Sequence, residues 1–268
     1  MASNLEELAR DKGLKGNAFK SIRETLMDQA AKIRVLGGPE HLPVEPVTTQ
    51  STAVAEQTPC VELDLDAEWQ RQAQNFVSLG FHKERGFEDT DEGKQVYLDT
   101  LAKFKPQPEG YKGRVDKPML IDYAIPWERQ RELSGIQLSD YFVLHLDQAH
   151  PWEDNHSMVP DGVTSYTGWF NKWGEGDFKD AIGPFSARKK LAKDLTGGIM
   201  HEAVAQQIHF PEDNANAQYY DIIGIRVVSG FVACLRRWGD RPRFSASWVD
   251  GADPNFRPLV RGSEIETK

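Results

Sequence analysis

The chain has almost no cysteine and no long apolar run, and both absences exclude whole classes of protein. Its 268 residues contain two cysteines, Cys60 and Cys234, which are too few for a disulfide scaffold or for a zinc site made of four thiolates. No stretch approaches the roughly 18 consecutive apolar residues of a membrane-spanning helix. The segment Met1–Arg10 carries acids where a secretory leader needs bases, so we expect a cytoplasmic protein with no membrane partner.

Basic charge is also in short supply. The sequence has 32 lysines and arginines against 41 aspartates and glutamates, a net charge of −9. Affinity for nucleic acid depends largely on basic side chains that neutralise phosphates, so we expect no nucleic-acid partner. With 39% apolar residues, the composition is that of a folded, soluble protein.

The common catalytic signatures are missing as well. The sequence contains no G-x-S-x-G nucleophile elbow, no G-x-G-x-x-G dinucleotide fingerprint and no H-E-x-x-H zinc motif. Cys234 lies in the apolar stretch VACLRRW, where a buried thiol behaves as a small apolar side chain. We therefore favour a protein that is not an enzyme and that needs no cofactor.

The composition predicts three parts: an amphipathic helical arm over residues 1–36, a linker rich in proline and threonine over 37–60, and a single domain over 61–268. The arm has an apolar stripe with side chains roughly four residues apart. Its main members are Phe19, Ile22, Leu26 and Ile33. A lone helix of this length is marginal in water unless its stripe is buried. We expect it to dock on a protein partner or a second copy; the alternative is packing on its own domain.

For the domain, periodicity and turn signals predict an α+β fold, with helices mainly in the N-terminal half and an antiparallel β-meander in the C-terminal half. Helices are expected to begin at the capping residues Asp66, Thr90 and Thr196. The expected strands are Met119–Ile125, Leu138–Leu146, Tyr220–Val228, Phe231–Trp238 and Arg243–Val249. Residues 150–183 are expected to be irregular.

Histidines gather just after the second expected strand. Three of the seven lie between His145 and His156. If Tyr141–Leu146 is a strand, His145 and Asp147 point to the same side about 6.5 Å apart. Together with His150 or His156 they would form a site with two histidines and one carboxylate for a divalent metal. This is the basis of an alternative function, a metal-dependent hydrolase or oxygenase; otherwise these are surface histidines in a polar loop.

Arginines and tryptophans alternate in the expected meander. Seven arginines lie between Arg226 and Arg261, and arginine beside aromatic rings binds carboxylates and phosphates. The anion-binding candidates are Arg236, Arg237, Arg241 and Arg243. The alternative is that they pair with the nearby acids Asp221, Asp240, Asp250 and Asp253.

Tryptophans of the C-terminal half support a third function. An open pocket lined by Trp169, Trp173 or Trp238 would make the chain a small-ligand or glycan-binding module.

Three segments of the chain resemble bacterial proteins grouped as a domain of unknown function. They are EWQRQAQNFVSLGF at Glu68–Phe81, GVTSYTGWF at Gly162–Phe170, and the tail Ile208–Gly262, which includes ACLRRWGDRPRFSASW. The resemblance covers roughly residues 65–262. It implies a single soluble domain and assigns no functional residue.

Overall fold

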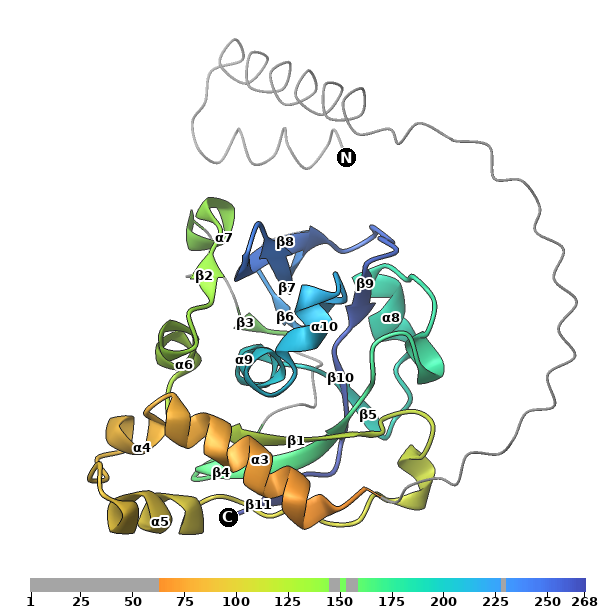
Figure 1. Ribbon diagram of the computed structural model, residues 1–268. Helices are drawn as coiled ribbons and strands as arrows, with labels where there is room; N and C mark the ends of the chain where they lie inside the picture. Colours follow the sequence, from red (N-terminus) through yellow and green to blue (C-terminus); the bar gives the residue numbers. More distant parts are fainter. Residues whose placement is uncertain (1–62, 145–149, 153–158, 228–229) are drawn as a thin grey trace, which may run out of the picture. The chain divides into compact units, whose positions relative to one another are not determined.

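The computed structural model describes residues 63–144, 150–152, 159–227 and 230–268 (Figure 1). The chain divides into two compact units, Met1–Pro59 and Cys60–Lys268, and all described residues belong to the second. The predicted docking stripe lies outside the described residues, so docking stays a prediction, as do the boundaries of the three predicted parts. Within the described ranges, no helix is long and apolar enough to cross a membrane.

The fold is α+β, as predicted, with two separate sheets. The first sheet has the order β1-β4-β10-β5, with β11 beside β4, and all its pairings are antiparallel. Its strands are β1 (Lys117–Asp122), β4 (Ser165–Phe170), β5 (Leu195–Gly197), β10 (Val260–Gly262) and β11 (Glu266–Thr267).

The second sheet has the order β2-β8-β7-β6-β3, with β9 beside β6. Its strands are β2 (Gln137–Leu138), β3 (His150–Pro151), β6 (Tyr219–Arg226), β7 (Phe231–Trp238), β8 (Arg241–Trp248) and β9 (Phe256–Pro258). Strands β6, β7 and β8 form the predicted antiparallel meander. The turn between β7 and β8 contains Gly239, whose φ of +64° suits a residue without a Cβ atom.

The helices lie mostly in the first half of the described chain and around the sheets. They are α3 (Leu65–Ser78), α4 (Phe81–Glu84), α5 (Asp91–Asp99), α6 (Trp127–Leu133), α7 (Asp140–Leu144), α8 (Pro184–Lys190), α9 (Met200–His209) and α10 (Pro211–Ala215), with short 3₁₀ turns at Glu109–Tyr111 and Gly176–Phe178.

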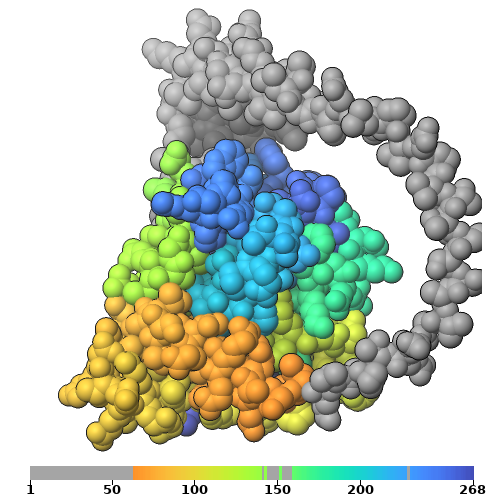
Figure 2. All heavy atoms as spheres, in the orientation of Figure 1, coloured from red at the N-terminus to blue at the C-terminus, as the bar shows by residue number. Residues whose placement is uncertain are grey.

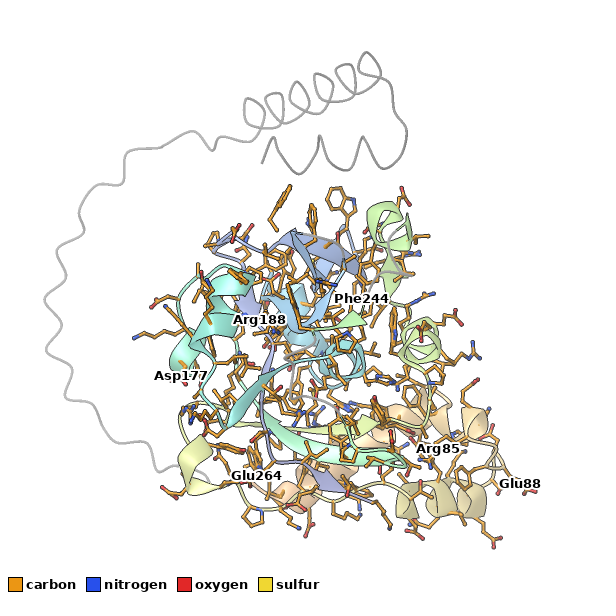
Figure 3. All side chains as sticks on the ribbon, turned by 180° about the vertical axis from the view of Figure 1, so that it is seen from behind. Arg85, Glu88, Asp177, Arg188, Phe244 and Glu264 are labelled. Carbon is orange, nitrogen blue, oxygen red and sulfur yellow. The ribbon has the colours of Figure 1, made fainter. Side chains whose placement is uncertain are left out.

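Helix α9 lies between the two sheets and organises the main core (Figure 1). Its small side chains Ala203 and Ala205 are fully buried and belong to the same cluster as Met119 of β1 and Ile222 of β6. Small residues allow the helix to approach both sheets closely. Phe244 of β8 (labelled in Figure 3) belongs to the same cluster and meets the ring of Trp127 edge to face at 5.8 Å.

The helix starts show where local signals were sufficient. Thr90 caps α5 as predicted, since its hydroxyl accepts from the Gly93 N–H at 3.1 Å. The cap of α3 is Asp64 and not Asp66, because the Asp64 side chain accepts the N–H groups of Asp66 and Ala67. Gly80, with φ of +81°, follows the end of this helix.

Three other expectations are wrong. The strand Leu138–Leu146 is mostly helix, because the Ser139 hydroxyl accepts from the Phe142 N–H at 3.2 Å and starts α7 after a two-residue β2. Thr196 caps no helix. It lies in β5 opposite Arg261, and α9 begins after Ile199, whose N–H is held by the Glu202 carboxylate at 2.8 Å.

The third error is the irregular stretch 150–183, which contains β4. Strand β4 is buried on both faces, apart from the half-buried Trp169. Its sequence, SYTGWF, therefore lacks the alternation of a strand with one face in water.

Candidate functional site

An open cleft of about 580 Å³ lies where α3, β1 and α10 meet. We call it the Lys117 cleft. Figure 2 shows this side of the described unit, where the orange atoms of α3 border the light-blue atoms of α9 and α10. The cleft is lined by Leu63, Glu68, Asp116, Lys117, Pro118, Lys172, Trp173, Glu175, Phe210, Asp213 and Gln218. Its volume suits a small molecule.

A buried polar cluster stands at its wall and joins the two sheets. Lys117 of β1 is 6% exposed, and its Nζ donates to Asp213 Oδ2 at 3.2 Å and to the Tyr220 hydroxyl at 3.1 Å. The Tyr220 hydroxyl and the Gln206 amide also donate to Asp213 Oδ2, at 3.0 and 2.8 Å. All four of these side-chain hydrogen bonds are internal, so the cluster is held in place before any ligand arrives.

The protonation of the cluster follows from its burial. Burial lowers the pKa of the Lys117 ammonium, although Asp213 acts in the opposite direction. Burial, followed by the charge of Asp213, raises the pKa of Tyr220 well above its ordinary value. Tyr220 therefore keeps its proton at neutral pH, and the charges of Lys117 and Asp213 offset one another.

Two aromatic rings form the apolar part of the cleft. The indole N–H of Trp173 donates to the Tyr219 carbonyl at 3.2 Å, and the Arg257 guanidinium lies 4.5 Å from its ring centroid. The Phe210 ring has the Lys117 ammonium at 4.8 Å and the Arg71 guanidinium at 5.2 Å. Both rings are thus fixed in orientation, and both already have a cation beside them.

The charged groups at the rim also have partners. Glu68 accepts from Arg71 at 2.6 Å, and Asp116 accepts from the Gln107 amide at 2.6 Å. Lys172 lies 3.9 Å from Glu175. The Lys117 cleft is therefore polar without a strong excess of one charge.

Of the three tryptophans expected at a ligand pocket, Trp173 is the one that meets the expectation. The hollow beside Trp169 measures about 30 Å³, which is the space of about one water molecule. Trp238 is 61% exposed on the surface. Of these three tryptophans, Trp173 is therefore the one that lines an open cleft of ligand size.

The anion-binding candidates come together only in part. Arg236 and Arg243 are directly opposite one another on β7 and β8, and their guanidinium carbons lie 5.3 and 5.9 Å from the Trp238 ring centroid. Arg237, on the other face of β7, donates to the Gly239 carbonyl at 3.0 Å. Arg241 has a distant, exposed contact of 3.9 Å with Asp240.

The alternative of pairing with local acids therefore holds for Arg241 alone among these four candidates. In the described part of the chain, no carboxylate lies within ion-pair distance of Arg236 or Arg243. Like charges in directly opposite positions are unfavourable, so these two guanidinium groups form a cationic patch that would be stabilised by an anion.

The metal candidates are left largely untested. His145, Asp147 and His156 lie outside the described residues. His150 lies in β3, and its backbone pairs with that of Arg226 in β6. The strand that placed His145 and Asp147 on one side is wrong, since α7 occupies its first part. The described ranges contain no other group of side chains arranged to hold a metal ion, and the cluster stays a prediction.

Sequence reasoning did not single out the Lys117 cluster. The one signal that would have found Lys117 is its place at the start of the apolar strand KPMLID, where a charged side chain needs a buried partner. That partner, Asp213, is 96 residues away and follows a proline in an ordinary acidic helix, so no local pattern connects the two.

Comparison with protein-family models, with curated proteins and with solved structures gave no match. The resemblance to the bacterial proteins of unknown function therefore stays a prediction, and the case for any function depends on the site itself.

Proposed function

We propose that the chain is a binding protein for a small, neutral, hydroxyl-rich ligand, such as a monosaccharide or short oligosaccharide, in the Lys117 cleft. The observation that carries the proposal is Trp173. Its ring forms a wall of an open cleft and is fixed by a hydrogen bond at one edge and a guanidinium over its plane. A rigid aromatic surface beside polar groups suits the apolar C–H face and the hydroxyl rim of a sugar ring.

The charges around the cleft support a neutral ligand. The lining contains four acids, Glu68, Asp116, Glu175 and Asp213, against two lysines, which disfavours an anion. A cationic ligand would compete with the cations already placed at Trp173 and Phe210. A neutral ligand meets neither obstacle.

The polar groups of the cleft can both accept hydrogen bonds from ligand hydroxyls and donate hydrogen bonds to them. The hydrogen bonds that Asp213 receives from side chains all end on Oδ2, which leaves Oδ1 as an acceptor. The Gln218 amide at the rim both donates and accepts. A second hollow of about 480 Å³ shares Glu68 and Phe210 with the cleft, so a longer chain of sugar units has a path past Phe210.

Isothermal titration calorimetry with a panel of mono- and disaccharides tests the proposal. For a sugar that binds the full-length protein, Trp173→Ala should weaken binding at least about tenfold, equivalent to about 1.4 kcal/mol. Trp238→Ala is the matched control, since that tryptophan is 61% exposed and is not among the residues that line the cleft, and it should leave binding unchanged. Absence of any sugar binding at millimolar concentration, or equal losses in the two variants, would reject the proposal.

Docking through residues 1–36 is a second candidate function, favoured by the apolar stripe at Phe19, Ile22, Leu26 and Ile33. Removing residues 1–60 should abolish binding to a protein partner, or self-association, while the remaining chain keeps its melting temperature. Light scattering after size-exclusion chromatography measures the self-association. A large loss of thermal stability would show instead that the segment belongs to the folded domain.

A further inference from the structure

A third hollow, of about 400 Å³, lies over the polar face of β6, β7 and β8 and shares no lining residue with the Lys117 cleft. We call it the Asp221 hollow. The register places Asp221 opposite Cys234, and Cys234 opposite Ser245. Neighbouring residues on these strands face the main core. The hollow is lined by Asp221, Arg236, Ala246, Ser247, Trp248, Gly251, Ala252, Asp253, Pro254 and Phe256.

Two lining groups of opposite charge are incompletely satisfied. Asp221 is 2% exposed, and among the described residues its Oδ1 has no hydrogen-bond partner; the Ser247 hydroxyl acts to lower the pKa of this carboxyl group. The Nε of Arg236 is also buried without a partner. Buried donors and acceptors are nearly always paired in folded proteins, so each of these atoms calls for a partner.

Asp221 and Arg236 do not satisfy one another. Arg236 lies two positions beyond Cys234 on the same face of β7, so it is diagonal to Asp221, roughly 7–8 Å away between Cα atoms. No ion pair joins the two side chains within the described part of the chain. A ligand between them would need a donor at one end and an acceptor at the other.

We propose that the Asp221 hollow binds a free α-amino acid, with its ammonium group on Asp221 and its carboxylate on Arg236. An amino acid carries these two groups on one carbon atom, and each can make a charge-assisted hydrogen bond of about 2.8 Å. Neighbouring charges strengthen each end, since Asp253 lines the hollow beside the carboxyl group and Arg243 lies opposite Arg236.

The remaining walls select the side chain of the amino acid. Trp248, Phe256 and Pro254 are apolar, and no charged side chain other than those of Asp221, Arg236 and Asp253 lines the hollow. An apolar side chain is therefore expected. The volume of the hollow excludes a folded partner and admits a single small molecule.

The protonation of Asp221 provides a second measurable effect of ligand binding. Burial raises the pKa of this carboxyl group to about 7, with Asp253 adding to the shift. Burial also raises the pKa of Cys234 to about 12, so the thiol stays neutral, and Arg236 is the one cation of the lining. A bound ammonium group favours the carboxylate. Binding at pH 6 should therefore release a proton.

Calorimetry of the full-length protein with each of the common L-amino acids tests the proposal. We expect an amino acid with an apolar side chain to bind at least tenfold more tightly than the amine lacking its carboxylate and the acid lacking its amine. Asp221→Asn and Arg236→Gln should each weaken binding at least tenfold. Arg237→Gln is the matched control, because Arg237 lies next along β7 on the opposite face, and it should have no effect.

Titrations at pH 6 in two buffers of different ionisation enthalpy measure the proton release, which should vanish in Asp221→Asn. Equal binding of the amine would show a cation site and reject the proposal, and equal binding of the acid would do so by showing an anion site. No binding by any amino acid at millimolar concentration would also reject the proposal. Trp173→Ala should leave amino-acid binding intact, so this test and that of the Lys117 cleft fail independently.

Discussion

Glu202 and Asp221 are both buried carboxyl groups, yet their surroundings differ completely. Glu202, 0% exposed, accepts from Arg261 Nε at 2.6 Å, from the Tyr166 hydroxyl at 2.9 Å and from the Ile199 N–H at 2.8 Å. Asp221 has an oxygen without a partner and faces a hollow. Both groups lie in the same unit and near the same α9–β6 core.

The difference separates a structural role from a binding role. Every donor around Glu202 comes from a different element, so the carboxylate fixes the start of α9 to β4 and β10. Asp221 makes no comparable set of bonds between elements of the described unit. A buried polar group that the protein leaves unsatisfied is expensive, and such groups are found where a ligand or water completes the set.

The largest expected effect is the loss of Arg261. Arg261→Met removes the cation from a pair in which both side chains are almost fully buried, and leaves the enclosed Glu202 without its ion-pair partner. We expect the free energy of unfolding to fall by about 3–5 kcal/mol, measured by urea denaturation. A loss below about 1 kcal/mol would show that Glu202 is no better partnered than Asp221 and would remove the contrast.

The next effect is a pH dependence that belongs to Asp221. Because its folded pKa of about 7 lies above the unfolded value, its contribution to stability is present in acid and is lost as the pH rises toward 7. From pH 5 to pH 8 the wild-type chain should lose about 2–3 kcal/mol relative to Asp221→Asn. Urea denaturation at both pH values measures this difference.

Two buried histidines change the stability in the opposite direction as the pH varies, so Asp221→Asn is needed as a reference. Burial lowers the pKa of His201 to about 4 and that of His209 to about 3, and these groups reduce stability as the pH falls below about 6.5. They are the same in both proteins and cancel in the comparison. Parallel pH profiles of wild type and Asp221→Asn would contradict the prediction.

The smallest effects come from removing one hydroxyl donor at each carboxyl group. Tyr166→Phe deletes one of three donors to Glu202 in a fully buried network, and should cost about 1.5 kcal/mol. Ser247→Ala at pH 6, where Asp221 is mostly protonated, should cost less than about 1 kcal/mol. Chemical denaturation of the two variants under the same conditions gives both values, and a larger cost for Ser247→Ala would reverse the comparison.

Sequence patterns predicted what depends on neighbours in the chain. Thr90 marks the start of a helix by its own chemistry, and periodicity with turn signals was enough to predict the strands of the meander. The strand predicted over 138–146 is wrong because an apolar run of that length fits a strand and a helix equally well. The cap at Ser139 favours the helix.

The sites depend on pairings that no local pattern contains. Lys117 meets Tyr220 across 103 residues, and Glu202 meets Arg261 across 59. From the sequence, Asp221 is expected only as a partner for arginine, and no arginine of the described ranges forms an ion pair with it. Its significance arises from the diagonal offset to Arg236, which exists only once β6 and β7 are in register.

Helix α9 has one more consequence for how the described unit comes apart. Because it packs on β1 and on β6, neither sheet can separate from the other without uncovering its buried alanines. Opening therefore has to be concerted, and the backbone amides near Ala203 should exchange with deuterium only when the whole unit unfolds. The rim of the Asp221 hollow, on the opposite face of the second sheet, is free of that constraint and can admit a solute while α9 stays closed.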